Sequence, residues 1–147
     1  MDKNLVYLTQ TDTTVGFLSA NKIKLNLIKK RDLKKEVLQV VKDFSILQLY
    51  TRVPDKFKKR IRNSKQETFI YPNRSAFRVV KISSQHYNFI KKFYVLYSTS
   101  ANVTNEQFDL EYASKFADII LYNKNNFNET NGSSIYKINN FKIKKVR

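Results

Sequence analysis

Residues 95–102 have the sequence Val-Leu-Tyr-Ser-Thr-Ser-Ala-Asn, and this stretch is the most informative about the fold. Its apolar start predicts a short buried strand over 95–97, and four hydroxyl or amide side chains follow within five residues. A turn at a strand end offers side chains and backbone N–H groups together, so it can hold a carboxylate or a phosphate. An ordinary polar turn that caps the next helix fits the same residues.

Strands and helices alternate on both sides of this stretch. Strands are predicted at 4–9, 37–41, 68–71, 76–80, 95–97 and 118–121, with one or two edge strands within 135–146. Helices are predicted at 21–31, 44–50, 54–63, 84–93 and 105–116. We find no repeat and no linker, so the prediction is an α/β fold, one domain over residues 1–147 around a twisted mixed sheet with flanking helices.

The chain of 147 residues carries a net charge of +16, which favours polyanionic partners such as RNA. A general lysine-rich bias of composition would give the same charge. The sequence has no cysteine, which excludes disulfides, thiolate catalysis and cysteine-bound metals. His86 is the only histidine and is predicted to lie on a helix surface. We therefore expect no protein metal site.

No apolar run approaches the length of a membrane span, and the first residues lack the long apolar region of a secretory signal. The expected location is the cytoplasm.

Two more polar segments stand near strand or helix ends. Residues 10–16, Gln-Thr-Asp-Thr-Thr-Val-Gly, could orient an amino acid, or could simply form a Thr- and Asp-rich turn. In Lys29-Lys30-Arg31, an extended exit from the helix would put Lys29 and Arg31 on one side, where two cations could hold a triphosphate. A solvated helix end is the alternative.

Arg78 lies within the apolar strand pattern 76–80, on the opposite face from Phe77 and Val79. An arginine on a buried face needs an anionic partner. A structural salt bridge and a substrate carboxylate would both serve.

Taken in order, these segments resemble the Sua5/YciO/YrdC family over about residues 5–137. Residues 98–102 are similar to the family's S-T-S-A-N turn, 68–72 to its T-x-x-x-P strand, and 76–80 to its arginine-bearing strand. Residues 11–16 resemble its P-T-E/D-T-x-x-G segment, 29–31 its K-x-R, and 132–135 its G-x-P-S-T-I/V ending. The resemblance implies synthesis of threonylcarbamoyl-AMP and pyrophosphate from L-threonine, bicarbonate and ATP.

The resemblance also implies roles for individual residues. L-Threonine would be held by Thr11, Thr13, Arg78 and Ser98. ATP would be held by Lys29, Arg31, Thr68, Ser100, Asn102, Ser133 and Ser134, with Mg²⁺ accompanying it. Lys29 and Arg31 would be the catalytic residues, because they would neutralise phosphate charge as pyrophosphate leaves. The product would pass to a threonylcarbamoyl-transferase that modifies tRNA.

The sequence departs from the family pattern at several positions. Gln10 and Val15 replace a proline and a frequent aromatic residue, and Asp32 and Glu36 replace prolines after the K-x-R segment. The chain is also shorter than most members. A non-catalytic module that binds double-stranded RNA or tRNA is therefore the alternative function, with Lys58, Lys59, Arg60 and Arg62 of helix 54–63 as its contacts. A third possible function is carbamoyl transfer, as in relatives of the hydrogenase-maturation type.

Overall fold

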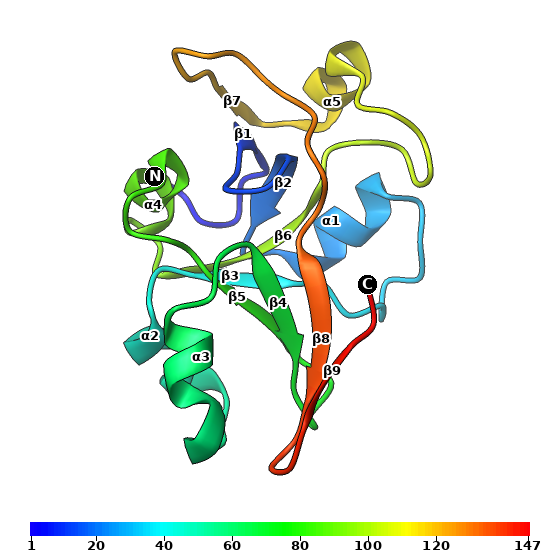
Figure 1. Cartoon of the computed structure of the whole chain (residues 1–147). Helices are drawn as coiled ribbons and strands as arrows, with labels where there is room; N and C mark the ends of the chain where they lie inside the picture. The colour runs from blue at the N-terminus through cyan, green and yellow to red at the C-terminus, as the bar shows by residue number, and fades with distance from the viewer.

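Nine strands form one mixed sheet in the order β7-β1-β2-β6-β3-β5-β4-β8-β9 (Figure 1). The structure is a computed structural model that describes residues 1–147. The strands are β1 Tyr7–Gln10, β2 Val15–Ser19, β3 Gln39–Val41, β4 Glu67–Ile70, β5 Ala76–Val79, β6 Val95–Ser100, β7 Ile119–Leu121, β8 Ser134–Ile138 and β9 Ile143–Lys145. The predicted α/β fold with a mixed sheet is confirmed.

Short helices connect the strands, and most begin at a side-chain cap. They are α1 Lys22–Ile28, α2 Phe44–Tyr50, η1 Asp55–Phe57, α3 Lys58–Arg62, α4 Gln85–Ile90 and α5 Leu110–Phe116. Asn21, Asp43, Ser84 and Asp109 each accept a hydrogen bond from a backbone N–H in the first turn of α1, α2, α4 and α5. None of these helices has the length and apolar character needed to cross a bilayer.

The two faces of the sheet have different surroundings. On one face, Leu25 of α1 packs with Phe17 of β2, while Leu47 of α2 and Ile61 of α3 pack with Phe77 of β5. The other face is covered over part of its area by α4 (residues 85–90), whose packing forms a smaller third cluster. The remainder of that second face is open, and the cavity described below lies over it.

Strand pairing brings three of the predicted site residues to this second face. Phe69 of β4 pairs with Phe77 of β5, and both side chains belong to the core on the first face. Their neighbours Thr68 and Arg78 therefore point to the opposite face, since adjacent residues of a strand alternate. The β6–β3–β5 pairings put Ser98 there as well.

The structure corrects three predicted elements. Residues 98–100 continue strand β6 rather than forming a turn, because they pair with β2 from Leu18 to Gly16. Strand β2 was not predicted, and Gly16 lies within it rather than in a turn. Helix α5 begins only after the Asp109 cap, because Asn105 has a left-handed backbone with φ of 67°.

Candidate functional site

One cavity of about 1250 Å³ opens over the second face of the sheet. All of the residues that the resemblance assigned to threonine or ATP line it: Thr11, Thr13, Lys29, Arg31, Thr68, Arg78, Ser98, Ser100, Asn102, Ser133 and Ser134. They come from segments more than a hundred residues apart in the chain. Their convergence on one cavity is a structural finding; their individual contacts with ligands stay predictions.

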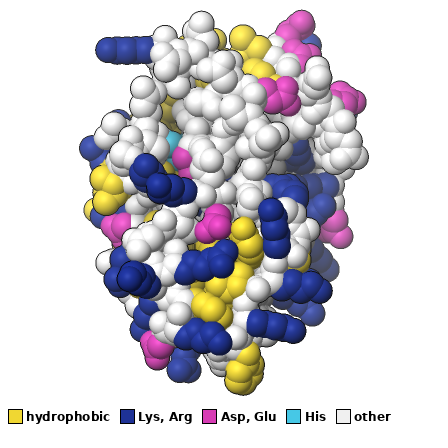
Figure 2. Space-filling view, in the orientation of Figure 1, with side chains coloured by type: hydrophobic (Ala, Val, Ile, Leu, Met, Phe, Trp, Pro, Cys, Tyr) yellow, Lys and Arg dark blue, Asp and Glu magenta, His cyan; other side chains and the backbone are white.

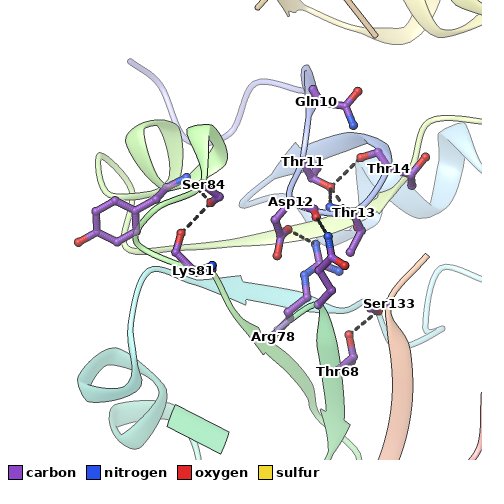
Figure 3. A network of polar contacts seen from close by, with 12 residues as sticks. Gln10, Thr11, Asp12, Thr13, Thr14, Thr68, Arg78, Lys81, Ser84 and Ser133 are labelled. Carbon is purple, nitrogen blue, oxygen red and sulfur yellow. Dashed lines mark hydrogen bonds and ion pairs between the residues drawn. The ribbon is translucent and has the colours of Figure 1, made fainter. Parts of the chain in front are cut away.

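The loop between β1 and β2 forms one wall of the cavity and is held by its own hydroxyl groups (Figure 3). Thr11 Oγ1 donates a hydrogen bond to the carbonyl of Thr14 at 2.6 Å and accepts one from the N–H of Thr13 at 3.1 Å. The hydroxyl groups of Thr11 and Thr13 lie 3.1 Å apart. The segment therefore forms the Thr- and Asp-rich turn that was one of its two predicted interpretations, and the same turn lines the cavity.

Arg78 points from β5 toward this loop and meets the carboxylate of Asp12 (Figure 3). Its Nη2 lies 3.0 Å from Asp12 Oδ1, with side chains 3% and 6% exposed. The atoms are close enough for an ion pair, but they do not meet hydrogen-bond geometry, and Arg78 Nε has no hydrogen-bond partner in the protein. Of the two partners predicted for Arg78, the salt bridge is present, and Nε is buried without a partner.

His86 lies in the interior, so its predicted surface position is wrong. The residue is 3% exposed, and neither ring nitrogen has a hydrogen-bond partner. Burial lowers the pKa of His86 to about 4; the charge of Asp12 opposes this shift and that of Arg78 adds to it. The missed signal is the spacing to Ile90, because residues four apart share a helix face and Ile90 is fully buried.

Helix α1 ends in a turn that fixes Lys29 and Arg31 at the cavity wall. The N–H of Arg31 donates to the carbonyl of Asn26 and that of Lys30 to Leu27, which are the two bonds of a Schellman motif. Lys30 occupies the left-handed position, with φ of 50°, where glycine is usual. The predicted extended exit from the helix is therefore wrong, although both cations reach the cavity.

The Lys29 ammonium group ties this helix end to the end of β6. Its Nζ donates to the carbonyl of Ser100 at 3.1 Å and also to the carbonyl and side-chain oxygens of Asn102. Burial, and then the charge of Arg31, lowers the pKa of Lys29 to about 8. Arg31 is held in turn by Asn26, whose Oδ1 accepts from Arg31 Nε at 2.6 Å.

The opposite side of the cavity joins β4, β8 and the end of the chain. Thr68 Oγ1 of β4 and Ser133 Oγ, just before β8, share a hydrogen bond of 2.7 Å (Figure 3). Arg147 Nη2 donates to the carbonyl of Ser133 at 3.0 Å, and Arg147 also lines the cavity. Sequence reasoning missed Arg147 as a site residue, because nothing local distinguishes it from other basic residues.

The connection between β7 and β8 crosses the front of the molecule before it enters β8 beside β4 (Figure 1). Three hydrogen bonds tie it to the β1–β2 loop and to the end of β1. Thr130 Oγ1 donates to the carbonyl of Thr13, and the N–H of Thr130 donates to Thr14 Oγ1 at 3.4 Å. The N–H of Asn128 donates to Gln10 Oε1 at 2.9 Å. Residues 129–133 of this connection line the cavity, so they form its outer rim.

The four basic residues predicted to contact RNA lie outside the cavity, on α3. Three of them have partners within the protein: Lys58 pairs with Asp55 at 2.5 Å, Arg60 with Glu67 at 3.5 Å, and the Arg62 guanidinium lies 4.7 Å from the ring centre of Phe44. Only Lys59 has no such contact, so α3 offers fewer free cations than its sequence indicates.

The chain has a Sua5/YciO/YrdC-type fold, as the resemblance predicted, because solved structures of this type are similar to nearly the whole of it. The chain is similar to E. coli YciO, with a TM-score of 0.77 and 16% identity over 99% of this chain and 83% of YciO. It is also similar to P. abyssi Sua5 complexed with L-threonine, with a TM-score of 0.73 and 13% identity over 98% of this chain and 50% of Sua5.

A third similar structure is full-length HypF in its phosphate- and nucleotide-bound form, with a TM-score of 0.73 and 17% identity over 98% of this chain. The chain spans about half the length of Sua5 and 27% of HypF. The sequence matches no protein-family model and no curated protein. These identities establish the fold alone.

Proposed function

We propose that the cavity binds ATP and L-threonine and that the chain forms threonylcarbamoyl-AMP with release of pyrophosphate. The observation that supports the proposal is the convergence of the eleven assigned residues on one cavity of about 1250 Å³. Its volume is sufficient for a nucleotide beside an amino acid. Of the proteins with a similar fold, P. abyssi Sua5 has been solved in complex with L-threonine and full-length HypF in a phosphate- and nucleotide-bound form.

The chemistry would need positioning and charge rather than a protein nucleophile. The carbamate formed from threonine and bicarbonate would attack the α-phosphorus of ATP, form a new P–O bond and break the bond to pyrophosphate. Lys29, Arg31 and Arg147 line the cavity from two sides, so they could balance the charge of the departing pyrophosphate. Arg78 lines the cavity, and its guanidinium group would bind the threonine carboxylate.

The protein has no group of three or more His, Cys, Asp or Glu side chains placed to hold a metal ion. Under the proposal, Mg²⁺ would be bound to the phosphates of ATP.

The test is pyrophosphate release by the purified protein given ATP, bicarbonate and L-threonine. We expect release that depends on threonine, that is weaker with L-serine, and that yields an adenylate of the mass of threonylcarbamoyl-AMP. Arg31→Gln should lower the rate at least ten-fold, because it removes a cation from the cavity wall. Arg52→Gln, outside the cavity, is the matched control. Release that is absent, or equal without threonine, would refute the proposal.

A further inference from the structure

A second cavity, of about 360 Å³, lies between the β4–β5 turn and the β8–β9 hairpin. Four basic side chains line it: Arg74, Lys137, Lys142 and Lys144. No acidic residue lines it, and none of these four cations forms an ion pair. Like charges around one hollow repel one another, and an anion placed among them would relieve that repulsion.

The β8–β9 hairpin holds two of these lysines on one surface. Lys137 pairs with Ile70 on one side and with Lys144 on the other, so all three side chains share a face of the sheet. Directly opposed lysines destabilise a sheet unless an anion lies near them. Figure 2 shows basic side chains around an apolar patch on the lower half of the molecule, where Figure 1 has β4, β8 and β9.

The tip of the hairpin is itself fixed. Asn139 Oδ1 accepts hydrogen bonds from the N–H groups of Phe141 and Lys142, each at 2.9 Å. Lys56 Nζ donates to the carbonyl of Phe141 at 2.6 Å and joins the tip to η1. Lys142 therefore projects from a constrained turn, which lowers the entropy lost when it binds a ligand.

Arg74 is placed by the turn on the other side of the cavity. Its N–H donates to the carbonyl of Tyr71 at 2.9 Å, and its φ of 66° is left-handed, a conformation that is unfavourable for a non-glycine residue. Arg74 also lines the main cavity, so the two cavities share this cation.

The remaining lining is mostly apolar, from Ile70, Pro72 and Ile138, together with Tyr71. The Tyr71 hydroxyl is buried and has no hydrogen-bond partner in the protein. Burial raises the pKa of Tyr71, so this hydroxyl keeps its proton. The four cations have no ion-pair partner; Arg74 and Lys142 lie on turns, and Lys137 and Lys144 lie on strands. Such a cluster is suited to an anion that carries clustered charge.

We propose that this second cavity, the hairpin site, binds phosphate groups of a ligand that carries two or more of them. Free pyrophosphate and the phosphodiester backbone of RNA both present this chemistry. The inference does not depend on the proposed synthase activity, because none of the three lysines lines the main cavity.

The test is a titration with sodium pyrophosphate, at constant ionic strength, of protein with labelled isoleucine, valine and alanine methyl groups. The Ile138 methyl reports the hairpin site, whereas Val15 and Ala101 report the main cavity. We expect a saturable shift of the Ile138 signal. In Lys137→Gln/Lys142→Gln/Lys144→Gln the affinity at Ile138 should fall at least ten-fold. In Lys3→Gln/Lys91→Gln/Lys124→Gln, which removes equal charge outside both cavities, it should not change.

An Ile138 signal that does not move, or that titrates equally in both triple variants, would overturn the hairpin site. Failure of the synthase would appear separately, as absent threonine-dependent pyrophosphate release. The source of the phosphate groups is distinguished by adding a short RNA duplex to the pyrophosphate-saturated protein. Loss of the pyrophosphate-bound Ile138 signal identifies RNA, and its persistence identifies a free polyphosphate; both outcomes support a phosphate site.

Discussion

Arg78 of β5 and Asp12 of the β1–β2 loop form an ion pair of 3.0 Å in which neither side chain is more than 6% exposed. The pair joins the floor of the cavity to one of its walls. Removing one partner of a buried ion pair leaves an uncompensated charge and costs about 3–5 kcal/mol. Arg78 therefore has a structural role as well as its proposed role in binding threonine.

Arg78→Lys separates these two roles. The variant keeps a cation beside Asp12 but loses the planar donor group that can bind two carboxylates at once. We expect it to unfold within a few degrees of the parent protein, but to lose the rise in Tm that L-threonine gives the parent. Arg78→Met should instead lower the free energy of unfolding by about 3 kcal/mol or more. A full threonine-induced Tm shift in Arg78→Lys would show that Arg78 does not bind the substrate.

Replacing each of the two glycines by alanine should affect the stability of the fold differently: Gly16→Ala should lower it, and Gly132→Ala should change it little. A Cβ at Gly16 would lie 3.0 Å from Thr11 Cγ2 and 3.2 Å from the backbone carbonyl of Thr99. We expect Gly16→Ala to lower the free energy of unfolding by about 1–3 kcal/mol and to impair threonine binding, since it displaces Thr11.

Gly132→Ala is the matched control, because its Cβ would meet only the flexible end of the Arg147 side chain, at 2.9 Å. Urea denaturation of both variants checks the difference. Equal stability of Gly16→Ala and the parent would contradict the close approach of β2 to the Thr11 loop.

The sequence predicted local structure better than long-range pairing. The predicted helix 44–50 matches α2, and the alternation around Arg78 placed it correctly away from Phe77. Strand β2 was missed because it is stabilised by pairing with β1, across a tight loop, and with β6, which is far away in the sequence. No local pattern in the sequence indicates either pairing. Asp12 was not assigned to a site for the same reason. Its partner is 66 residues away, and only the fold brings them together.

The candidate site was predicted through motif order rather than geometry. The resemblance assigned Thr11, Ser100 and Ser133 to one site, and the fold places them on one cavity. Local reasoning predicted an extended backbone after Lys29, whereas the structure has a Schellman turn. Such a turn with lysine in the left-handed position has no sequence signature. A prediction based on the order of motifs remains correct despite such local errors, because the order depends on the succession of strands and not on the conformation of single turns.

His86 should make the protein sensitive to acid. Because its folded pKa of about 4 lies below the ordinary 6.5, the unfolded chain binds more protons between these pH values. The contribution of His86 is therefore complete above pH 6.5 and is lost as the pH falls toward 4. In His86→Leu we expect this loss of stability to be smaller, by up to about 3 kcal/mol. The substitution breaks no hydrogen bond, because neither ring nitrogen has a partner.

Urea denaturation of both proteins at pH 7 and at pH 4.5 measures the difference. Parallel pH dependence in the parent and His86→Leu would mean that the histidine is protonated in the folded state.

Lys29 should make ATP binding sensitive to alkali. Burial and the charge of Arg31 lower the pKa of Lys29 to about 8, so the ammonium group loses its proton between pH 7 and pH 9. If only the charged form binds phosphate, the competent fraction falls roughly ten-fold over this range, and the apparent Kd for ATP rises by the same factor. Lys29→Arg keeps its charge throughout and should show a nearly constant Kd.

Calorimetric titration of ATP at pH 7, 8 and 9 compares the two proteins. Folding stability is a separate readout with the opposite sign. Above pH 8 the unfolded chain holds the Lys29 proton more tightly than the folded protein, so this group's contribution to stability rises with pH. A constant Kd in the parent, or an equal rise in Lys29→Arg, would show that the Lys29 charge is used only to join α1 to β6 and not to bind the nucleotide.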